Sequence, residues 1–169
     1  MPSQKSLIIL RHAKAVPTKA DLDDHERPLD EQGQAEARHV GQRLAALELR
    51  PDLIFCSSSV RTRQTAEIIQ SCLPEMPITY SKALYLASPS EILKLVAECS
   101  DDIKQLLIIG HNPGAHELAI KLARGGEEKA LNEMTLTFPT AAVAAINFEN
   151  TSWDSIARAG GMLRYFITP

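Results

Sequence analysis

The chain has 169 residues, of which 44% are hydrophobic and 23% are charged, and these values are ordinary for a globular protein. This length suits one well-developed hydrophobic core, so we expect residues 1–169 to form a single domain. The formal net charge of −3 provides no overall positive field to recruit nucleic acid or an anionic membrane, so an anion site must be built from a few local cations.

The sequence shows no targeting segment and no cysteine-based metal site. The apolar block at 7–10 is too short for a signal-peptide core and far too short to span a bilayer. The three cysteines, Cys56, Cys72 and Cys99, are odd in number and have no metal-like spacing, so we interpret them as reduced thiols. We therefore expect a cytoplasmic protein that does not bind membranes.

Strand-like and helix-like patterns alternate along the chain. Apolar residues repeat on one face of the first helix, for which Asp30 is a plausible N-cap. In chain order, the predicted elements are a strand at 6–11, a helix at 29–49, a strand at 52–58, a helix at 60–73, a strand at 77–81, a helix at 88–99, a strand at 105–110, a helix at 112–126 closed by two glycines, and strands at 140–148 and 161–168. The alternation predicts an α/β fold of three layers, with a mostly parallel central sheet and helices on both faces.

Three of the predicted strands end in polar residues that can bind or transfer an anion. The first ends in Arg11–His12, the second in the serine run 57–59 just before two arginines, and the strand at 105–110 in the sequence HNPG, 111–114. In open parallel sheets, ligand sites gather beyond the carboxyl ends of the strands. We therefore expect two histidines and at least two arginines to share one crevice.

This collection of side chains favours phosphate chemistry over metal binding. Arginines present planar N–H groups that match phosphate oxygens, and two of the three strand ends lead directly into helix N-termini, which also attract anions. Two histidines beside such a site suggest a nucleophile and a second donor. Carboxylates and thiols are missing from these strand ends, so we expect no metal ion and no other cofactor.

Taken together and in this order, the stretches LRHA, CSSSVRTRQTAE and IIGHNPG resemble the signature of the histidine phosphatase superfamily, which includes the cofactor-dependent phosphoglycerate mutases. Within it, the chain looks most like the small SixA-type phosphohistidine phosphatases, and this resemblance is supported by the stretches DHERPLDEQG, ALYLASPSEIL, FPTAAVAAI and GGMLRYFITP. The resemblance covers essentially the whole chain. It implies a phosphoglycerate-mutase-like fold and one histidine phosphatase domain over 1–169.

The resemblance also implies roles for particular residues. His12 matches the nucleophile that becomes phosphorylated, and His111 matches the second histidine of the pocket. The catalytic set is His12, His111, Arg11 and Arg61, and the substrate-binding set is Arg11, Arg61, Arg27 and Asn112. Arg63 lies roughly half a turn from Arg61 on the predicted helix and should face elsewhere.

The sequence departs from the family pattern in two places. Ala13 replaces the glycine that follows the histidine in the family motif, and its methyl group restricts backbone angles and the approach of a phosphate. No general acid is securely matched. Glu91 is the nearest candidate, although it could be only a charge at the start of a helix.

These residues predict a two-step mechanism. His12 should attack phosphorus with an unprotonated nitrogen while an acceptor such as a backbone carbonyl holds the other nitrogen. Nearby Arg11, Arg61 and a protonated His111 should lower the pKa of His12. Water then hydrolyses the phosphohistidine intermediate.

The absence of a matched acid favours a substrate whose leaving group needs little help. An imidazole leaving group can itself be protonated, whereas an alkoxide leaves poorly without an acid. We therefore expect a metal-independent phosphatase that acts on phosphohistidine in a protein, such as a histidine phosphotransfer domain, and that works as a monomer. The alternatives are a small-molecule phosphomonoesterase that uses the same pocket and a non-catalytic phosphate-binding module.

Overall fold

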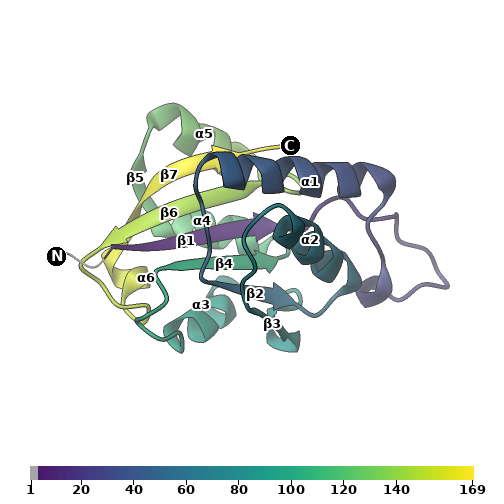
Figure 1. Ribbon diagram of the computed structural model, residues 1–169, viewed down its shortest axis with the longest axis horizontal. Helices are drawn as coiled ribbons and strands as arrows, with labels where there is room; N and C mark the ends of the chain where they lie inside the picture. The colour runs from purple at the N-terminus through teal and green to yellow at the C-terminus, as the bar shows by residue number, and fades with distance from the viewer. Residues whose placement is uncertain (1–3) are drawn as a thin grey trace.

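The computed structural model describes residues 4–169, in which seven strands form one sheet between two layers of helices (Figure 1). The sheet order is β3-β2-β4-β1-β6-β7-β5. Its strands are β1 (Gln4–Arg11), β2 (Leu53–Ser57), β3 (Ile78–Ser81), β4 (Gln105–Gly110), β5 (Ala123–Gly126), β6 (Val143–Glu149) and β7 (Gly161–Ile167). Among them only β6 runs opposite to the rest, so the predicted α/β fold with a mostly parallel sheet is confirmed.

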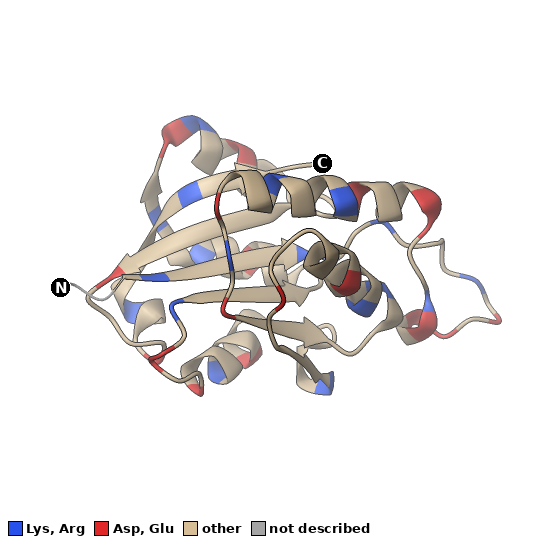
Figure 2. Ribbon diagram, viewed as in Figure 1, with Lys and Arg blue, Asp and Glu red and all other residues tan. Residues whose placement is uncertain are grey.

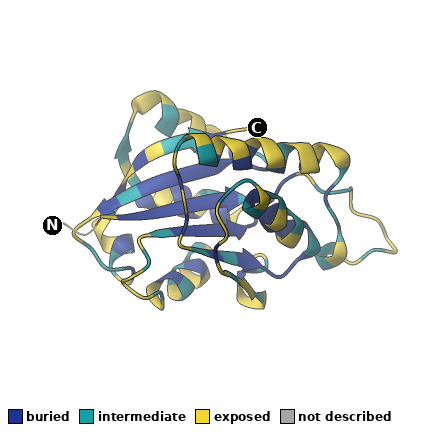
Figure 3. Cartoon of the chain, viewed as in Figure 1, coloured by how far each residue is buried: buried dark blue, intermediate teal, exposed yellow. Residues whose placement is uncertain are grey.

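The helices cover both faces of this sheet. They are α1 (Glu31–Ala46), α2 (Val60–Ser71), α3 (Pro89–Ala97), α4 (Gly114–Leu122), α5 (Glu128–Leu136) and α6 (Ile156–Ala159), with short 3-10 turns η1 (Asp24–Glu26) and η2 (Lys82–Leu84). Ile8 and Leu10 of β1 pack in the core beneath α1 and α2, while Leu7 and Ile9 pack in the opposite core beneath α3 and α4. Because successive side chains of a strand point to opposite faces, one apolar run fills both cores (Figure 3).

Local capping explains where the helices next to the pocket begin. The Asp30 side chain accepts the Gly33 N–H at the start of α1, and Ser59 accepts from Thr62 at the start of α2. Side-chain oxygens at such positions satisfy N–H groups that have no partner within the helix. These signals are local, which is why the helix starts predicted from the sequence lie within about two residues of the starts in the structure.

The predicted helix at 112–126 is wrong at its C-terminal end. Helix α4 stops at Leu122, and Ala123–Gly126 form β5, which pairs in parallel with β7. Gly126 has a φ of 147°, which no helix contains. The two glycines therefore lie in a short edge strand that depends on a partner far along the chain, and the sequence pattern alone did not reveal this pairing.

The strand order brings the three polar strand ends together. Strands β2, β4 and β1 are neighbours, and their carboxyl ends meet at one edge of the sheet. The start of α4 packs tightly on the segment after η2, since a Cβ atom on Gly114 would lie 1.9 Å from the Ala87 carbonyl oxygen. Charged residues lie mainly on the helices and loops around the sheet (Figure 2). No helix within residues 4–169 has the length and apolar character that crossing a bilayer requires.

Candidate active site

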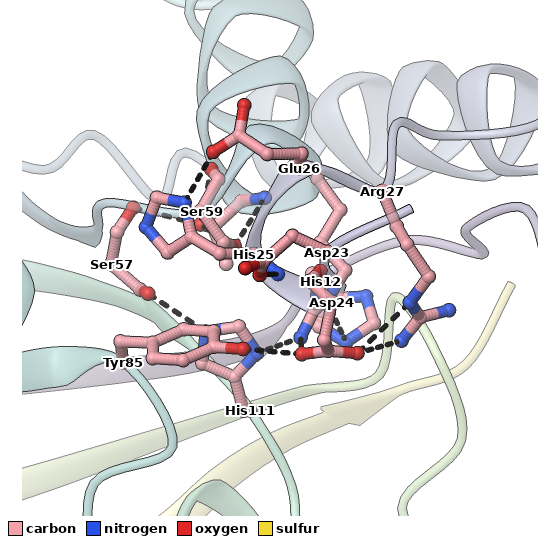
Figure 4. Close-up of polar contacts among 12 residues, drawn as sticks. His12, Asp23, Asp24, His25, Glu26, Arg27, Ser57, Ser59, Tyr85 and His111 are labelled. Atoms are coloured by element: carbon pink, nitrogen blue, oxygen red, sulfur yellow. Dashed lines mark hydrogen bonds and ion pairs between the residues drawn. The ribbon is translucent and has the colours of Figure 1, made fainter. Parts of the chain in front are cut away.

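The structure brings all the predicted site residues together around one open pocket of about 410 Å³ at the carboxyl ends of the strands. Its lining includes every member of the predicted set: Arg11, His12, Arg27, Arg61, His111 and Asn112. These residues come from the end of β1, the η1 segment, the first turn of α2 and the loop after β4. Figure 4 shows His12, Arg27 and His111 of this set. Histidines and arginines that are distant along the chain therefore line one crevice, and the chemical role of each stays a prediction.

His12 is held in one tautomer. Its Nδ1–H donates to the Ala13 carbonyl oxygen at 2.7 Å, so the lone pair lies on Nε2, which accepts from Arg61 Nε at 3.3 Å. Burial, together with the charges of Arg61, Arg11 and Arg27, lowers the pKa of His12 to about 4, although the hydrogen bond to Ala13 opposes the shift. The ring is therefore neutral at pH 7 and Nε2 is unprotonated, which is the state that the predicted nucleophile requires.

Arg61 is the central cation of the site, with only 2% of its surface exposed. Its guanidinium donates to the Asp24 carbonyl oxygen at 2.6 Å and the Asp24 carboxylate at 3.0 Å. It also donates to Nδ1 of His111 at 3.3 Å. Arg63 points away, with its guanidinium 4.5 Å from the Tyr80 ring centre, which confirms that the two arginines face different directions.

Asp24 and Tyr85 are site residues that the sequence analysis missed. The Asp24 carboxylate pairs with Arg61 and Arg27 and accepts a hydrogen bond from the Tyr85 hydroxyl. That hydrogen bond, with those to the two arginines, holds the pKa of Asp24 well below its usual range. The signal was the D-x-x-R spacing within the DHERPL stretch, which places Asp24 and Arg27 three residues apart in one short turn.

His111 differs from the expected protonated donor. Burial, together with the nearby His12 and the charge of Arg61, lowers the pKa of His111 to about 3, and only Asp24 opposes this shift. Its Nδ1 accepts from Arg61, so Nε2 carries the proton and donates to the Ser57 hydroxyl at 2.7 Å. The expectation of a protonated His111 is therefore wrong for the free site, because burial among cations disfavours the charged ring.

Arg11 and Asn112 donate hydrogen bonds to the same backbone carbonyl oxygen. Arg11 Nη1 and Asn112 Nδ2 both donate to the Phe138 carbonyl oxygen, at 3.1 and 2.8 Å. Burial and the nearby Arg61 lower the pKa of the Arg11 guanidinium, which nevertheless stays charged at neutral pH. The Phe138 carbonyl thus orients the two side chains on this wall of the pocket.

The two departures from the family pattern have structural explanations. Ala13 has no positive φ, and its N–H donates to the Thr65 hydroxyl, so alanine fits this position without backbone strain. Glu91 is absent from the pocket lining. It accepts the Ser88 N–H at 2.7 Å in a capping box, and this bond lowers the pKa of Glu91. The candidate acid is therefore a helix cap.

The arrangement is suited to a tetrahedral oxyanion. Among the described lining residues, Arg11, Arg27, Arg61 and Lys14 are cationic, and Asp24 is the single carboxylate. Such a cluster attracts phosphoryl oxygens and stabilises charge that develops on them during transfer. Within residues 4–169 no group of three or more His, Cys, Asp or Glu side chains is placed to hold a metal ion.

The two buried imidazoles predict an unusual titration. We expect that neither the His12 nor the His111 ring shifts in an NMR titration from about pH 8 to about pH 5, because both pKa values lie near 4 or below. An unfolded histidine takes up a proton near pH ~6.5, so the free energy of unfolding should fall as the pH drops from about 6.5 towards 4. The urea-unfolded chain is the control, and a midpoint near 6.5 for either ring in the folded protein would contradict this assignment.

Comparisons with known proteins agree with this geometry. Residues 7–85 match the family model of the histidine phosphatase superfamily (branch 1). An uncharacterised protein of Mycobacterium tuberculosis is 33% identical over 139 residues, which cover 81% of this chain and 85% of the relative.

Two solved structures extend the likeness to almost the whole fold. The proposed phosphohistidine phosphatase SixA of Nakamurella multipartitia is 28% identical, with a TM-score of 0.87 over 98% of this chain and 96% of that one. The protein histidine phosphatase SixA in complex with tungstate is 22% identical, with a TM-score of 0.77 over 97% of each chain, and shows the same fold. With its motifs, its fold and these relatives in agreement, this chain belongs to the histidine phosphatase superfamily and is of the SixA type.

Proposed function

We propose that this phosphatase hydrolyses phosphohistidine in a protein and that His12 carries the phosphoryl group between two chemical steps. The observation that carries the proposal is the tautomer of His12. Nδ1 is tied to the Ala13 carbonyl oxygen, and the lone pair of Nε2 faces the cationic wall formed by Arg61. A neutral, oriented imidazole beside phosphate-binding arginines is the arrangement that phosphoryl transfer to nitrogen requires.

In the first step His12 Nε2 attacks phosphorus as the bond from phosphorus to the substrate nitrogen breaks. The electron pair of that bond stays on the substrate imidazole, which is neutral after departure if it was protonated before. Arg11, Arg61 and Arg27 stabilise the charge on the three transferring oxygens. In the second step water attacks phosphorus, the bond from His12 Nε2 to phosphorus breaks, and inorganic phosphate leaves.

His111 changes protonation state during this cycle. It is neutral in the free site because burial and its cationic neighbours lower its pKa to about 3. A bound phosphoryl group brings negative charge beside the ring, which raises the pKa of His111, so the ring binds a proton at Nδ1 and donates a hydrogen bond from that N–H to a phosphoryl oxygen. Ser57 holds Nε2, which leaves Nδ1 as the nitrogen that faces the site.

The acid–base inventory of the pocket supports a nitrogen leaving group. Asp24 is the single carboxylate among the described lining residues, and its pKa is held low by Tyr85 and two arginines, so it is a poor proton donor at neutral pH. An alkoxide would depart slowly from such a site, whereas a protonated imidazole departs without an enzymatic acid. The pocket is also open to solvent, as a substrate histidine on the surface of a partner protein would require.

Steady-state kinetics on two substrate classes test the proposal. We expect the enzyme to hydrolyse a histidine phosphotransfer domain, phosphorylated on its histidine, with a kcat/KM at least about 100-fold above that for a panel of sugar and nucleotide phosphates, because only the esters need a general acid. A preference for the esters would instead identify a small-molecule phosphomonoesterase. If the wild-type protein binds phosphate but shows neither turnover nor a phosphorylated His12, it is a phosphate-binding module.

A further inference from the structure

An exposed leucine stands at the mouth of the phosphoryl pocket. Leu86 lies in the turn between η2 and α3, lines the pocket and is 56% exposed. Single exposed leucines are common on protein surfaces and carry no meaning by themselves. Leu86 is different because two further observations concern the same residue: its backbone conformation and the way its neighbours are fixed.

The backbone of Leu86 is held in an unfavourable conformation. Its φ is 51°, in the left-handed region that glycine and asparagine adopt readily and that a branched apolar residue adopts at a cost. Residues in such conformations persist only where their surroundings fix them, and they concentrate at functional sites and ligand contacts. Glycine would adopt this φ without strain, so leucine at this position has a cost to stability.

The residues on either side of Leu86 explain how the turn is fixed. The Tyr85 side chain points inward, where its hydroxyl donates to the Asp24 carboxylate and its ring packs edge-to-face with His111, with 5.3 Å between the ring centres (Figure 4). On the other side, the Ala87 carbonyl is packed so closely on Gly114 that no larger residue would fit there. With Tyr85 and Ala87 tied to the catalytic frame, the Leu86 side chain is presented outward at the pocket rim.

We infer that Leu86 is the docking contact for the protein that carries the phosphoryl group, an inference that rests on the proposed function. The pocket interior is polar and cationic and fits the phosphoryl group, but it offers little apolar surface to the rest of a substrate. A leucine at the mouth is buried only when something larger than a phosphate lies over the opening. An apolar patch beside the phosphohistidine of a protein surface is the chemistry that would cover it.

Burial of a half-exposed leucine on docking corresponds to about a tenfold gain in affinity. We therefore expect Leu86→Gly to raise the KM for the phosphorylated phosphotransfer domain about tenfold while kcat stays nearly constant. For phosphoramidate, which has a phosphorus–nitrogen bond but no carrier, kcat/KM should change less than about twofold. Because glycine suits a φ of 51°, the melting temperature should stay the same or rise.

Two further variants separate docking from a structural role. Leu86→Asn keeps a side chain that tolerates the left-handed backbone but removes the apolar contact, so it should reproduce the KM effect. Met162→Ala is the matched control: Met162 is 58% exposed, close to the value for Leu86, but lies at the amino end of β7, on the opposite edge of the sheet. It should leave both substrates unaffected.

The possible outcomes are distinct. Equal losses on phosphoramidate and the phosphotransfer domain, an unchanged KM for the domain, or a fall in melting temperature for Leu86→Gly would each overturn the docking inference and leave the proposed function intact. Failure of the wild-type enzyme to hydrolyse the phosphorylated domain, with turnover of phosphoramidate retained, would overturn both proposals.

Discussion

Replacing His12 with alanine should reduce turnover by about 10⁴-fold or more, while inorganic phosphate still binds. The loss is large because the proposed route passes through a bond from Nε2 to phosphorus, and no other described lining residue offers an unprotonated nitrogen held by a carbonyl in this way. Binding should persist because the arginines on the other walls remain. Rapid-quench kinetics and isothermal titration with phosphate measure the two effects separately.

The phosphorylated His12 intermediate can also be detected directly, by comparing the wild-type protein with His12→Ala. After brief exposure to a labelled phosphodonor, the wild-type protein should carry an acid-labile phosphate on His12, and His12→Ala should carry none. His39→Ala is the control, since His39 is an exposed residue of α1 outside the pocket lining. Normal turnover by His12→Ala would refute the assignment of the nucleophile.

Arg61→Ala should weaken phosphate binding by about 100-fold and lower turnover by about 10³-fold, so that affinity and catalysis fall together. The side chain is 2% exposed and contacts Asp24, His12 and His111. Its removal leaves the partly buried Asp24 carboxylate with one cation fewer, and both imidazoles lose a hydrogen-bond donor. Arg61→Lys should rescue little, because a single ammonium cannot reach partners that lie in several directions around a planar guanidinium.

Arg63→Ala is the matched control for this substitution. Both arginines lie in the first turns of α2, but Arg63 donates to the Ser58 carbonyl oxygen and covers Tyr80 outside the pocket lining. Its removal deletes the same charge, and kcat/KM should stay within about threefold of the wild type. Titration calorimetry with phosphate and steady-state kinetics on the same preparations make the comparison. Equal effects of the two substitutions would mean that general positive charge, and not the placement of Arg61, supports catalysis.

The sequence predicted most of the fold because its signals were local. The apolar run of β1 showed a strand, and Asp30 and Ser88 marked helix starts through side chains only three residues from the N–H groups that they accept. The predicted end of α4 was wrong because the signal that decides it is not local. Whether 123–126 extends a helix or joins a sheet is decided by pairing with β7, which lies more than thirty residues further along the chain.

For the site, the sequence by itself determined which residue types stand at the ends of three strands, and therefore that two imidazoles and several guanidinium groups face one edge of the sheet. Only the tertiary structure decided how those groups are paired. The Asp24 carboxylate reaches Arg61 across 37 positions and Tyr85 across 61 positions of the chain, and spacing along the sequence carries no information about such contacts. The neutral state of His111 was also beyond the sequence, because a pKa depends on burial and on neighbouring charges, which exist only once the chain is folded.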